Sequence, residues 1–408
     1  MAENGHNGFP LSEGWTNLRF HSAVSERDEA PAAVSEAIGA TLAALGDRVD
    51  VVFLFFTADH RDDAEAIVER VWLELDPQAV VGVCGEGVIG GDAEVERKPG
   101  LALLAASMPG VRLHTFHFRG DDWHDVLEDD DALRERAGIG PETRATVAFG
   151  DPFTTPINQV LTAFDRAAKG IPLVGGMASA ARQPGGNVLV RNDTVLIDGM
   201  VGVSLSGELE VETVVSQGCR PVGRPFVVTR AHDNVIDQLG GKPALEALRE
   251  TVNTLPEAER QRLSNGLFVG RAINEYREAW GRGDFLVRNV MGVDQEAGSL
   301  AVTDYVRVGQ TVQFHVRDAA TADEDLALLL EGQVKSDRPP AGGLLFSCNG
   351  RGQRMFEEKC HDVGAARKAM PKTPVAGFFA AGELGPVGGR NFIHGHTASF
   401  ALFRPKKV

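Results

Sequence analysis

Residues 373–404, TPVAGFFAAGELGPVGGRNFIHGHTASFALFR, contain two short apolar runs separated by a polar loop rich in glycine. The runs cover residues 375–380 and 398–403. Short apolar runs bounded by glycine and proline are typical of buried strands rather than helices. The stretch therefore predicts two core strands joined by a wide loop, and loops held by a rigid scaffold often carry binding groups.

The same order of elements (strand, helix, glycine loop, strand) occurs three times along the chain. The first copy covers residues 50–108, the last covers 342–403, and a weaker copy covers 146–207. Even the Gly-Glu pair of the first loop, Gly85-Glu86, recurs as Gly382-Glu383. A repeat this long with strands this apolar indicates sheets covered by helices. The predicted fold class is α/β, with repeated strand-helix-strand units forming helix-covered sheets in two lobes.

The chain has 408 residues, which predicts two or three domains at roughly 150 residues per domain. The turn Gly-Cys-Arg-Pro-Val-Gly at residues 218–223 is the natural boundary between lobes. We therefore expect an N-terminal arm and first helix at 1–45, a first domain at 46–224 and a second domain at 225–408.

Charge and cysteine content exclude several classes of protein. The formal net charge of −16 argues against nucleic acid as a partner, since phosphates demand a basic face. No apolar run approaches the ~20 residues of a membrane span, and the N-terminus lacks the pattern of a signal peptide. The four cysteines lie far apart without a C-x-x-C pair, which fits reduced thiols. We expect a cytoplasmic protein that binds neither nucleic acid nor membrane.

Several motifs together resemble the FIST domain family of sensory modules. They are VVGVCGEGVIGG and GLALLAASMPG in the first half, and SQGCRPVG, DNVIDQLGGKPALEAL and AGFFAAGELGPVGGRNFIHGHTASFALF in the second. The resemblance covers about residues 46–404 as FIST N-terminal and C-terminal domains in tandem. It implies a sensor of small ligands, with amino acids the leading suggestion, and some members are described as haem-containing nitric-oxide sensors. The chain shows no kinase, receiver, cyclase or F-box segment, so we expect its output to pass through a separate partner.

Two cysteine-containing turns are candidate ligand sites. Cys219 and Arg220 lie in the interlobe turn, where the cation favours a reactive thiol, although a small buried residue at a tight turn is a common fate for a free cysteine. Cys348, Asn349 and Arg351 end a core strand, where α/β proteins commonly bind ligands. Arg351 there suits a carboxylate. A plain turn is the alternative.

The closing loop supplies the other candidates: Glu383, Arg390, Asn391, His394 and His396. Glu383 and Arg390 together offer the opposite charges that an amino-acid zwitterion needs. Asn391 can assist with the carboxylate, and the histidines can line the pocket by hydrogen bonding. No third ligand stands at a metal-site spacing, so we expect no metal.

Three other functions stay open at this point. A haem sensor would take an axial ligand from His394, His396, His232 or Cys219, although no C-x-x-C-H attachment motif is present. An enzyme would use Cys219 or Glu383, but neither has the context of a known nucleophile motif, and no nucleotide fingerprint occurs. A protein-interaction scaffold is the third. The sequence favours non-catalytic binding of an amino acid or similar metabolite, with no cofactor.

Overall fold

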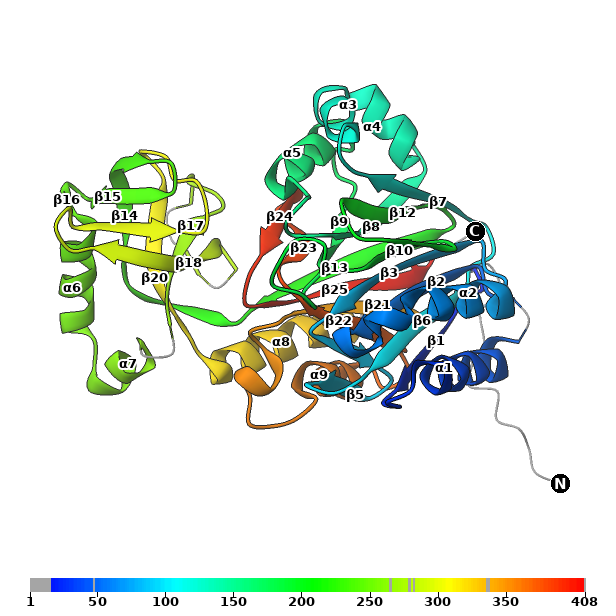
Figure 1. Cartoon of the computed structure of the whole chain (residues 1–408). Coiled ribbons are helices and arrows are strands. Elements are labelled where there is room, and N and C mark those ends of the chain that lie inside the picture. The colour runs from blue at the N-terminus through cyan, green and yellow to red at the C-terminus, as the bar shows by residue number, and fades with distance from the viewer. Residues whose placement is uncertain are drawn as a thin grey trace.

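The computed structural model describes residues 16–46, 48–263, 266–277, 280–281, 283–334 and 338–406. Figure 1 shows a large body and a smaller lobe that lies to one side of it. Within the described residues, the body holds three six-stranded sheets and the small lobe one seven-stranded sheet. The chain leaves the body after β13 (Leu209–Gln217) and returns at α8 (Ala319–Val334). The α/β class and the two lobes predicted from the sequence are therefore confirmed.

Each sheet of the body is built on one of the three predicted repeat units. In every unit the first two strands are parallel, a helix connects them, and a third strand returns antiparallel to the first. Unit 1 contains β2 (Val51–Thr57), α2 (Ala64–Leu75), β3 (Ala79–Gly85) and β6 (Leu101–Ser107). Unit 2 contains β8 (Thr143–Gly150), α5 (Ile157–Ala167), β9 (Leu173–Met177) and β12 (Met200–Gly207). Unit 3 contains β21 (Gly342–Cys348), α9 (His361–Ala369), β22 (Val375–Ala380) and β25 (Thr397–Pro405).

A further strand flanks each returning strand. They are β1 (Arg19–Ser25), β7 (Val111–Phe118) and β13, which pair with β6, β12 and β25. The sequence predicts a loose arm at the N-terminus, and residues 1–15 of it lie outside the described residues. Residues 19–25 instead form the edge strand β1, because their register against β6 supplies a complete antiparallel ladder.

The units exchange hairpins around a ring. Unit 1 extends the sheet of unit 3 with β4 (Gly87–Gly90) and β5 (Ala93–Glu96). Unit 2 extends the sheet of unit 1 with β10 (Leu189–Arg191) and β11 (Thr194–Leu196). Unit 3 extends the sheet of unit 2 with β23 (Glu383–Val387) and β24 (Arg390–His394). The body is therefore a pseudo-threefold arrangement in which the C-terminal strands lie among the N-terminal ones.

One glycine in each unit fixes how the repeats align. A Cβ on Gly82, Gly175 or Gly377 would lie 2.5, 1.8 or 1.7 Å from a carbonyl oxygen of the neighbouring strand. Those carbonyls belong to Leu54, Ala148 and Leu345, so the residues that follow them, Phe55, Phe149 and Phe346, are equivalent. Their rings meet at the centre of the body, with centroids 5.6 Å apart for Phe55–Phe149 and 5.9 Å for Phe149–Phe346. Aromatic side chains, one from each unit, therefore pack together at the pseudo-threefold axis.

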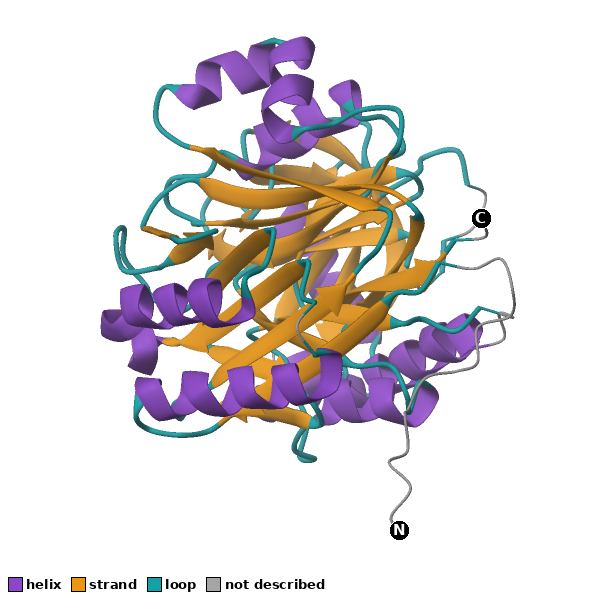
Figure 2. Ribbon diagram, turned by 90° about the vertical axis from the view of Figure 1, so that its right-hand side faces the viewer, coloured by secondary structure: helices purple, strands orange, loops and turns teal. Residues whose placement is uncertain are grey.

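Helices cover the outer faces of the sheets, as Figure 2 shows. The covering helices are α1 (Ala30–Leu45) and α2 on the first sheet, α3 (Asp122–Glu128), α4 (Asp130–Ala137) and α5 on the second, and α8 and α9 on the third. Helix α9 of unit 3 begins only at His361, so residues 349–360 are left as a connecting segment that carries part of the candidate site. In the described part of the chain, no helix has both the length and the apolar character needed to cross a membrane.

The small lobe closes on itself. Its strands are β14 (Cys219–His232), β15 (Val235–Leu239), β16 (Lys242–Pro243), β17 (Leu267–Ala272), β18 (Phe285–Asp294), β19 (Ser299–Val302) and β20 (Thr311–Arg317). Strand β14 pairs with both β20 and β15, so the sheet forms a barrel, with α6 (Ala244–Thr254) and α7 (Glu257–Arg262) beside it. The predicted boundary at residue 224 falls inside β14, and the division into sequence domains stays a prediction.

Candidate functional site

The loop that follows β21 separates two groups of polar side chains. Arg354 extends from this loop to the surface, whereas Arg351 extends into the interior. Both groups lie where the parallel strands β21 and β22 end, which is where α/β proteins usually place ligand sites. The loop itself is therefore the element that connects surface and interior.

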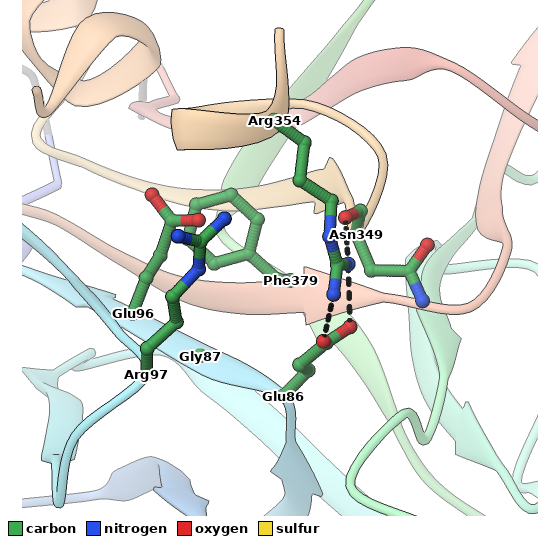
Figure 3. A pocket seen from close by; sticks show the side chains of 7 residues that line it. All are labelled: Glu86, Gly87, Glu96, Arg97, Asn349, Arg354 and Phe379. Carbon is green, nitrogen blue, oxygen red and sulfur yellow. Dashed lines mark hydrogen bonds and ion pairs between the residues drawn. The ribbon is translucent and has the colours of Figure 1, made fainter. Parts of the chain in front are cut away.

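The outer group forms a small recess, shown in Figure 3. Arg354 reaches across it to Glu86, which follows β3 of unit 1. Arg354 Nη1 lies 2.8 Å from Glu86 Oε2, and Nη2 donates to the other carboxylate oxygen, so the pair is bidentate. The free volume of about 10 Å³ suits one water molecule. The recess is lined by Glu86, Gly87, Glu96, Arg97, Asn349, Arg354 and Phe379.

Glu96 fixes the loop from the other side of the recess. Its carboxylate accepts a hydrogen bond from the backbone N–H of Gln353 at 3.0 Å. Gly352 has φ +54°, which favours glycine, and a Cβ there would lie 2.6 Å from Glu96 Oε1, so a larger residue would displace the Glu96 carboxylate. Burial raises the pKa of Glu96. The recess thus contains two carboxylates: Glu86 pairs with the Arg354 guanidinium, and Glu96 binds the backbone of the loop that carries Arg354.

The inner group, the buried cluster, consists of Cys348, Arg351, Asp362, Glu383 and Thr397. Arg351 donates to Asp362 through Nε at 2.8 Å and Nη2 at 2.7 Å, and both side chains are fully buried. Burial alone would raise the pKa of Asp362, but Arg351 outweighs it and holds that pKa well below its usual range. Arg351 and Asp362 are therefore a charged pair in the interior.

Glu383 is the second carboxyl group of the buried cluster. Its Oε2 accepts hydrogen bonds from Thr397, at 2.7 Å from Oγ1 and 3.3 Å from the backbone nitrogen. Burial raises the pKa of Glu383 to about 8, so the group is mostly protonated at neutral pH. Burial and the nearby Glu383 raise the pKa of the Cys348 thiol to about 12. Within the described residues, neither Glu383 Oε1 nor Arg351 Nη1 has a hydrogen-bond partner.

His396 joins the buried cluster to the small lobe. It has φ +62°, an uncommon conformation for a residue with a side chain. Its Nδ1 lies 2.9 Å from Arg317 Nη2 and its Nε2 lies 2.9 Å from Asn289 Oδ1. Burial lowers the pKa of His396 to about 4, so the neutral ring accepts from Arg317 and donates to Asn289. A Cβ on Gly350 would lie 2.9 Å from Arg317 Nη2, so the loop after β21 also contacts the lobe.

Cys219 lies at the start of β14, buried against Phe268 and Val287. Burial raises the pKa of this thiol to about 12. A protonated, inaccessible thiol is a poor nucleophile and a poor metal ligand. Arg220 beside it extends to Asp318, with Nε 3.3 Å from the carboxylate. The structure therefore places Cys219 and Arg220 in strand β14 rather than in a turn.

The remaining predicted residues hold the β23–β24 hairpin in place. Asn391 donates to Asp165 at 2.9 Å and accepts from the backbone of Leu173 at 2.8 Å. Arg390 is exposed beside Asp165, at 3.4 Å. His394 Nε2 lies 2.9 Å from the carbonyl of Gly385, so the two histidines have separate partners.

The structure does not bring Glu383 and Arg390 together. Glu383 pairs with His394, whereas Arg390 pairs with Val387 at the far end of the hairpin. Four residues along a strand correspond to about 13 Å. Of the ten predicted residues, the loop region unites Cys348, Asn349, Arg351, Glu383 and His396, with Cys219 nearby.

Sequence reasoning missed Arg354, Asp362 and Arg317. Arg354 was detectable as the second arginine of the turn after Cys348, three residues beyond Arg351. Its partner Glu86 belongs to the Gly-Glu pair noted in the sequence but stands 268 positions away. Asp362 and Arg317 carried no signal in the sequence, since each becomes relevant only through its buried partner.

The fold and the site define a two-lobed α/β protein whose polar side chains gather where the strands of its repeat units end. The chain belongs to the FIST family: the FIST N domain matches residues 50–242 and the FIST C domain matches residues 244–386. FIST domains are associated with sensory signal transduction and small-ligand binding. The family resemblance seen in the sequence is therefore confirmed.

Mycobacterial proteins are similar over nearly the whole chain. The uncharacterized protein Rv0628c of Mycobacterium tuberculosis is 38% identical over 396 residues, covering 95% of this chain and 100% of the relative. The uncharacterized protein Mb0898c of Mycobacterium bovis is 39% identical over 389 residues, covering 95% and 99%. Among solved structures, a cyanuric acid hydrolase from A. caulinodans covers 96% of this chain and 100% of its own, at a TM-score of 0.35 and 9% identity. A likeness at that level carries no functional conclusion.

Proposed function

We propose that this protein is a non-catalytic sensor that binds an amino acid or a similar zwitterion in the recess and signals through a separate partner protein. The observation that carries the proposal is the bidentate pair of Glu86 and Arg354. The two side chains come from different repeat units and meet at a surface that solvent reaches, with exposed fractions of 35% and 38%. The free cysteines support a cytoplasmic location as part of this proposal.

A zwitterion can take over both halves of this ion pair. Arginine binds a carboxylate through two parallel hydrogen bonds, and a carboxylate accepts from an ammonium group. A bidentate pair is stronger than an ordinary exposed one, so a ligand must replace both of its hydrogen bonds in order to separate it. The recess now has room for one water, so binding requires Arg354 to move away from Glu86.

Movement of Arg354 has a route to the small lobe. Arg354 and Arg351 belong to the same short loop, and Gly350 of that loop touches Arg317. Arg317 in turn contacts His396, which holds Asn289 of β18. Two chain crossings, after β13 and after β20, join the lobes covalently. We therefore place the output of the sensor in the orientation of the small lobe.

Isothermal titration calorimetry with a panel of amino acids tests the proposal. Glu86→Ala and Arg354→Ala should each weaken binding by about 10-fold or more, since each removes a charged hydrogen-bond partner. Arg354→Lys should lose most of the affinity because it keeps the charge without the bidentate geometry. Arg112→Ala, an exposed arginine paired with Glu142, is the matched control and should bind as the wild type does. Binding that survives both alanine substitutions would place the ligand elsewhere.

A further inference from the structure

A second hollow opens on the body where β2 ends, and the proposed function does not use it. Its volume is about 490 Å³. Small-molecule sites commonly measure about 300–1,000 Å³. One wall is the segment after β2, with Ala58, Arg61 and Asp62, and the other is the loop after β9, with Ala180 and Arg182.

This hollow is the counterpart of the recess in a different pair of repeat units. Counted from the three aligned glycines and their facing carbonyls, Ala58 of unit 1 occupies the position of Asn349 in unit 3. In the same way, Ala180 of unit 2 occupies the position of Gly87 in unit 1. Ala58 and Ala180 line the hollow, just as Asn349 and Gly87 line the recess. The two openings are therefore one feature of the repeat, present twice.

The third counterpart has apolar side chains beside it. It lies between the loop after β8 and the turn at Gly382. A Cβ on Gly382 would lie 2.7 Å from Ile393 Cδ1 and 3.5 Å from Met177 Cγ, so apolar side chains occupy that space.

Two arginines give the hollow its chemical character. Arg61 Nη2 donates to the carbonyl of Gly185 at 2.9 Å, which holds the guanidinium at the wall and leaves its other N–H groups for a ligand. Arg182 has no ion-pair partner among the residues that the structure describes. Asp62 is exposed at the same opening and suits a hydroxyl or amino group on the same ligand.

We propose that this hollow is a second binding site, for a small organic anion whose phosphate or carboxylate group pairs with Arg61 and Arg182. Two guanidinium groups at one opening are notable in a chain with a formal net charge of −16. The planar guanidinium group of arginine can form two parallel hydrogen bonds with either a phosphate or a carboxylate, so the feature that both candidate ligands share is an oxyanion. This site does not depend on the recess, since the two openings share none of their lining residues.

Calorimetric titration of the full chain with inorganic phosphate and with succinate, at constant ionic strength, tests the proposal. Arg61→Ala and Arg182→Ala should each weaken binding at least about 10-fold. Arg119→Ala, an exposed arginine elsewhere in the body, is the control and should leave binding unchanged. Thermal unfolding of each variant shows whether it is folded. Arg354→Ala should also leave phosphate and succinate binding intact, which separates this site from the recess.

Each outcome decides the proposal. If phosphate binds and both arginine substitutions weaken its binding, the natural ligand carries a phosphate group. If the same result is obtained with succinate, the ligand carries a carboxylate. If neither phosphate nor succinate binds with a dissociation constant below about 10 mM, the proposal is overturned, because a useful site would bind more tightly than that. Binding that neither arginine substitution changes overturns it as well.

Discussion

Arg351 and Asp362 form a complete ion pair in the interior, with two nitrogen–oxygen distances of 2.8 and 2.7 Å. The same carboxylate accepts from Ser347 Oγ at 2.6 Å, so its charge is well compensated. The pair fixes the loop after β21 to α9, because Asp362 belongs to the first turn of that helix. It holds the inner side of the loop while Glu86 and Glu96 hold the outer side.

Asp362→Asn should destabilise the protein by roughly 3–5 kcal/mol, because it leaves the Arg351 guanidinium buried without a counter-charge. Urea unfolding at neutral pH measures this change. Asp323→Asn is the control: Asp323 also contacts His361, at 3.2 Å, but its side chain is 63% exposed. That substitution should change the free energy of unfolding by less than about 0.5 kcal/mol. Equal effects of the two changes would contradict the buried-pair interpretation.

Glu383→Gln should reduce the fall in stability between about pH 4.5 and 8. Burial raises the pKa of Glu383 to about 8 in the folded state from its ordinary value of 4.5. The folded protein therefore holds a proton that the unfolded chain releases, so stability falls as pH rises from 4.5 towards 8. One such group contributes a slope of about 1.4 kcal/mol per pH unit.

The difference between the variant and the wild type between pH 6.5 and 8 shows this effect. The pKa values of His394 and His396 are lowered to about 4, and histidines of the unfolded chain titrate near 6.5, so these groups add a slope of opposite sign at the lower end of the window that cancels in the comparison. Glu94, with a pKa raised to about 8 by burial and by Asp362, contributes in the same direction. Glu94→Gln therefore serves as a parallel variant, and each substitution should remove part of the slope. An equal pH dependence of stability in the wild type and in Glu383→Gln across this window would refute the assignment.

Gly377→Ala should be among the most destabilising single changes in the chain, on the order of 3 kcal/mol or more. The added Cβ would lie 1.7 Å from the Leu345 carbonyl oxygen, so the parallel strands β21 and β22 must separate. Gly364→Ala is a matched control in the exposed face of α9, where no atom lies within 4 Å of the new methyl group. That change should stabilise the helix by about 0.5–1 kcal/mol. Thermal unfolding of the two variants compares them directly.

His396→Ala should loosen the small lobe without unfolding the body. The substitution removes the ring that contacts both Arg317 and Asn289. Hydrogen exchange should accelerate in β18 and at the end of β20, while β2 and β8 keep their protection. Arg390→Ala, an exposed change on the body, should leave the exchange of β18 unaltered. Unchanged exchange in β18 after His396→Ala would show that His396 does not couple the lobes.

The repeat units and the family were readable from the sequence, because apolar strands and their glycines follow each other in order along the chain. The site was readable only in part. Cys348 and Arg351 were found because they directly follow a predicted strand. The exchange of hairpins decides which side chains face each other, and it joins residues such as Glu86 and Arg354 that no local pattern connects. The pairing of Glu383 with Arg390 failed for the same reason, since register within the hairpin places them apart.

The ring of exchanged hairpins also determines when the body can become complete during synthesis. Hairpin β4–β5 pairs with β22, so Val88 has no strand partner until Phe378 has left the ribosome. Until then, the first unit presents strands with unpaired backbone groups, which are prone to association with other chains. Pairing over such a distance in sequence also slows folding. The last part of the chain to be made is therefore the part that closes the sheets begun by the first.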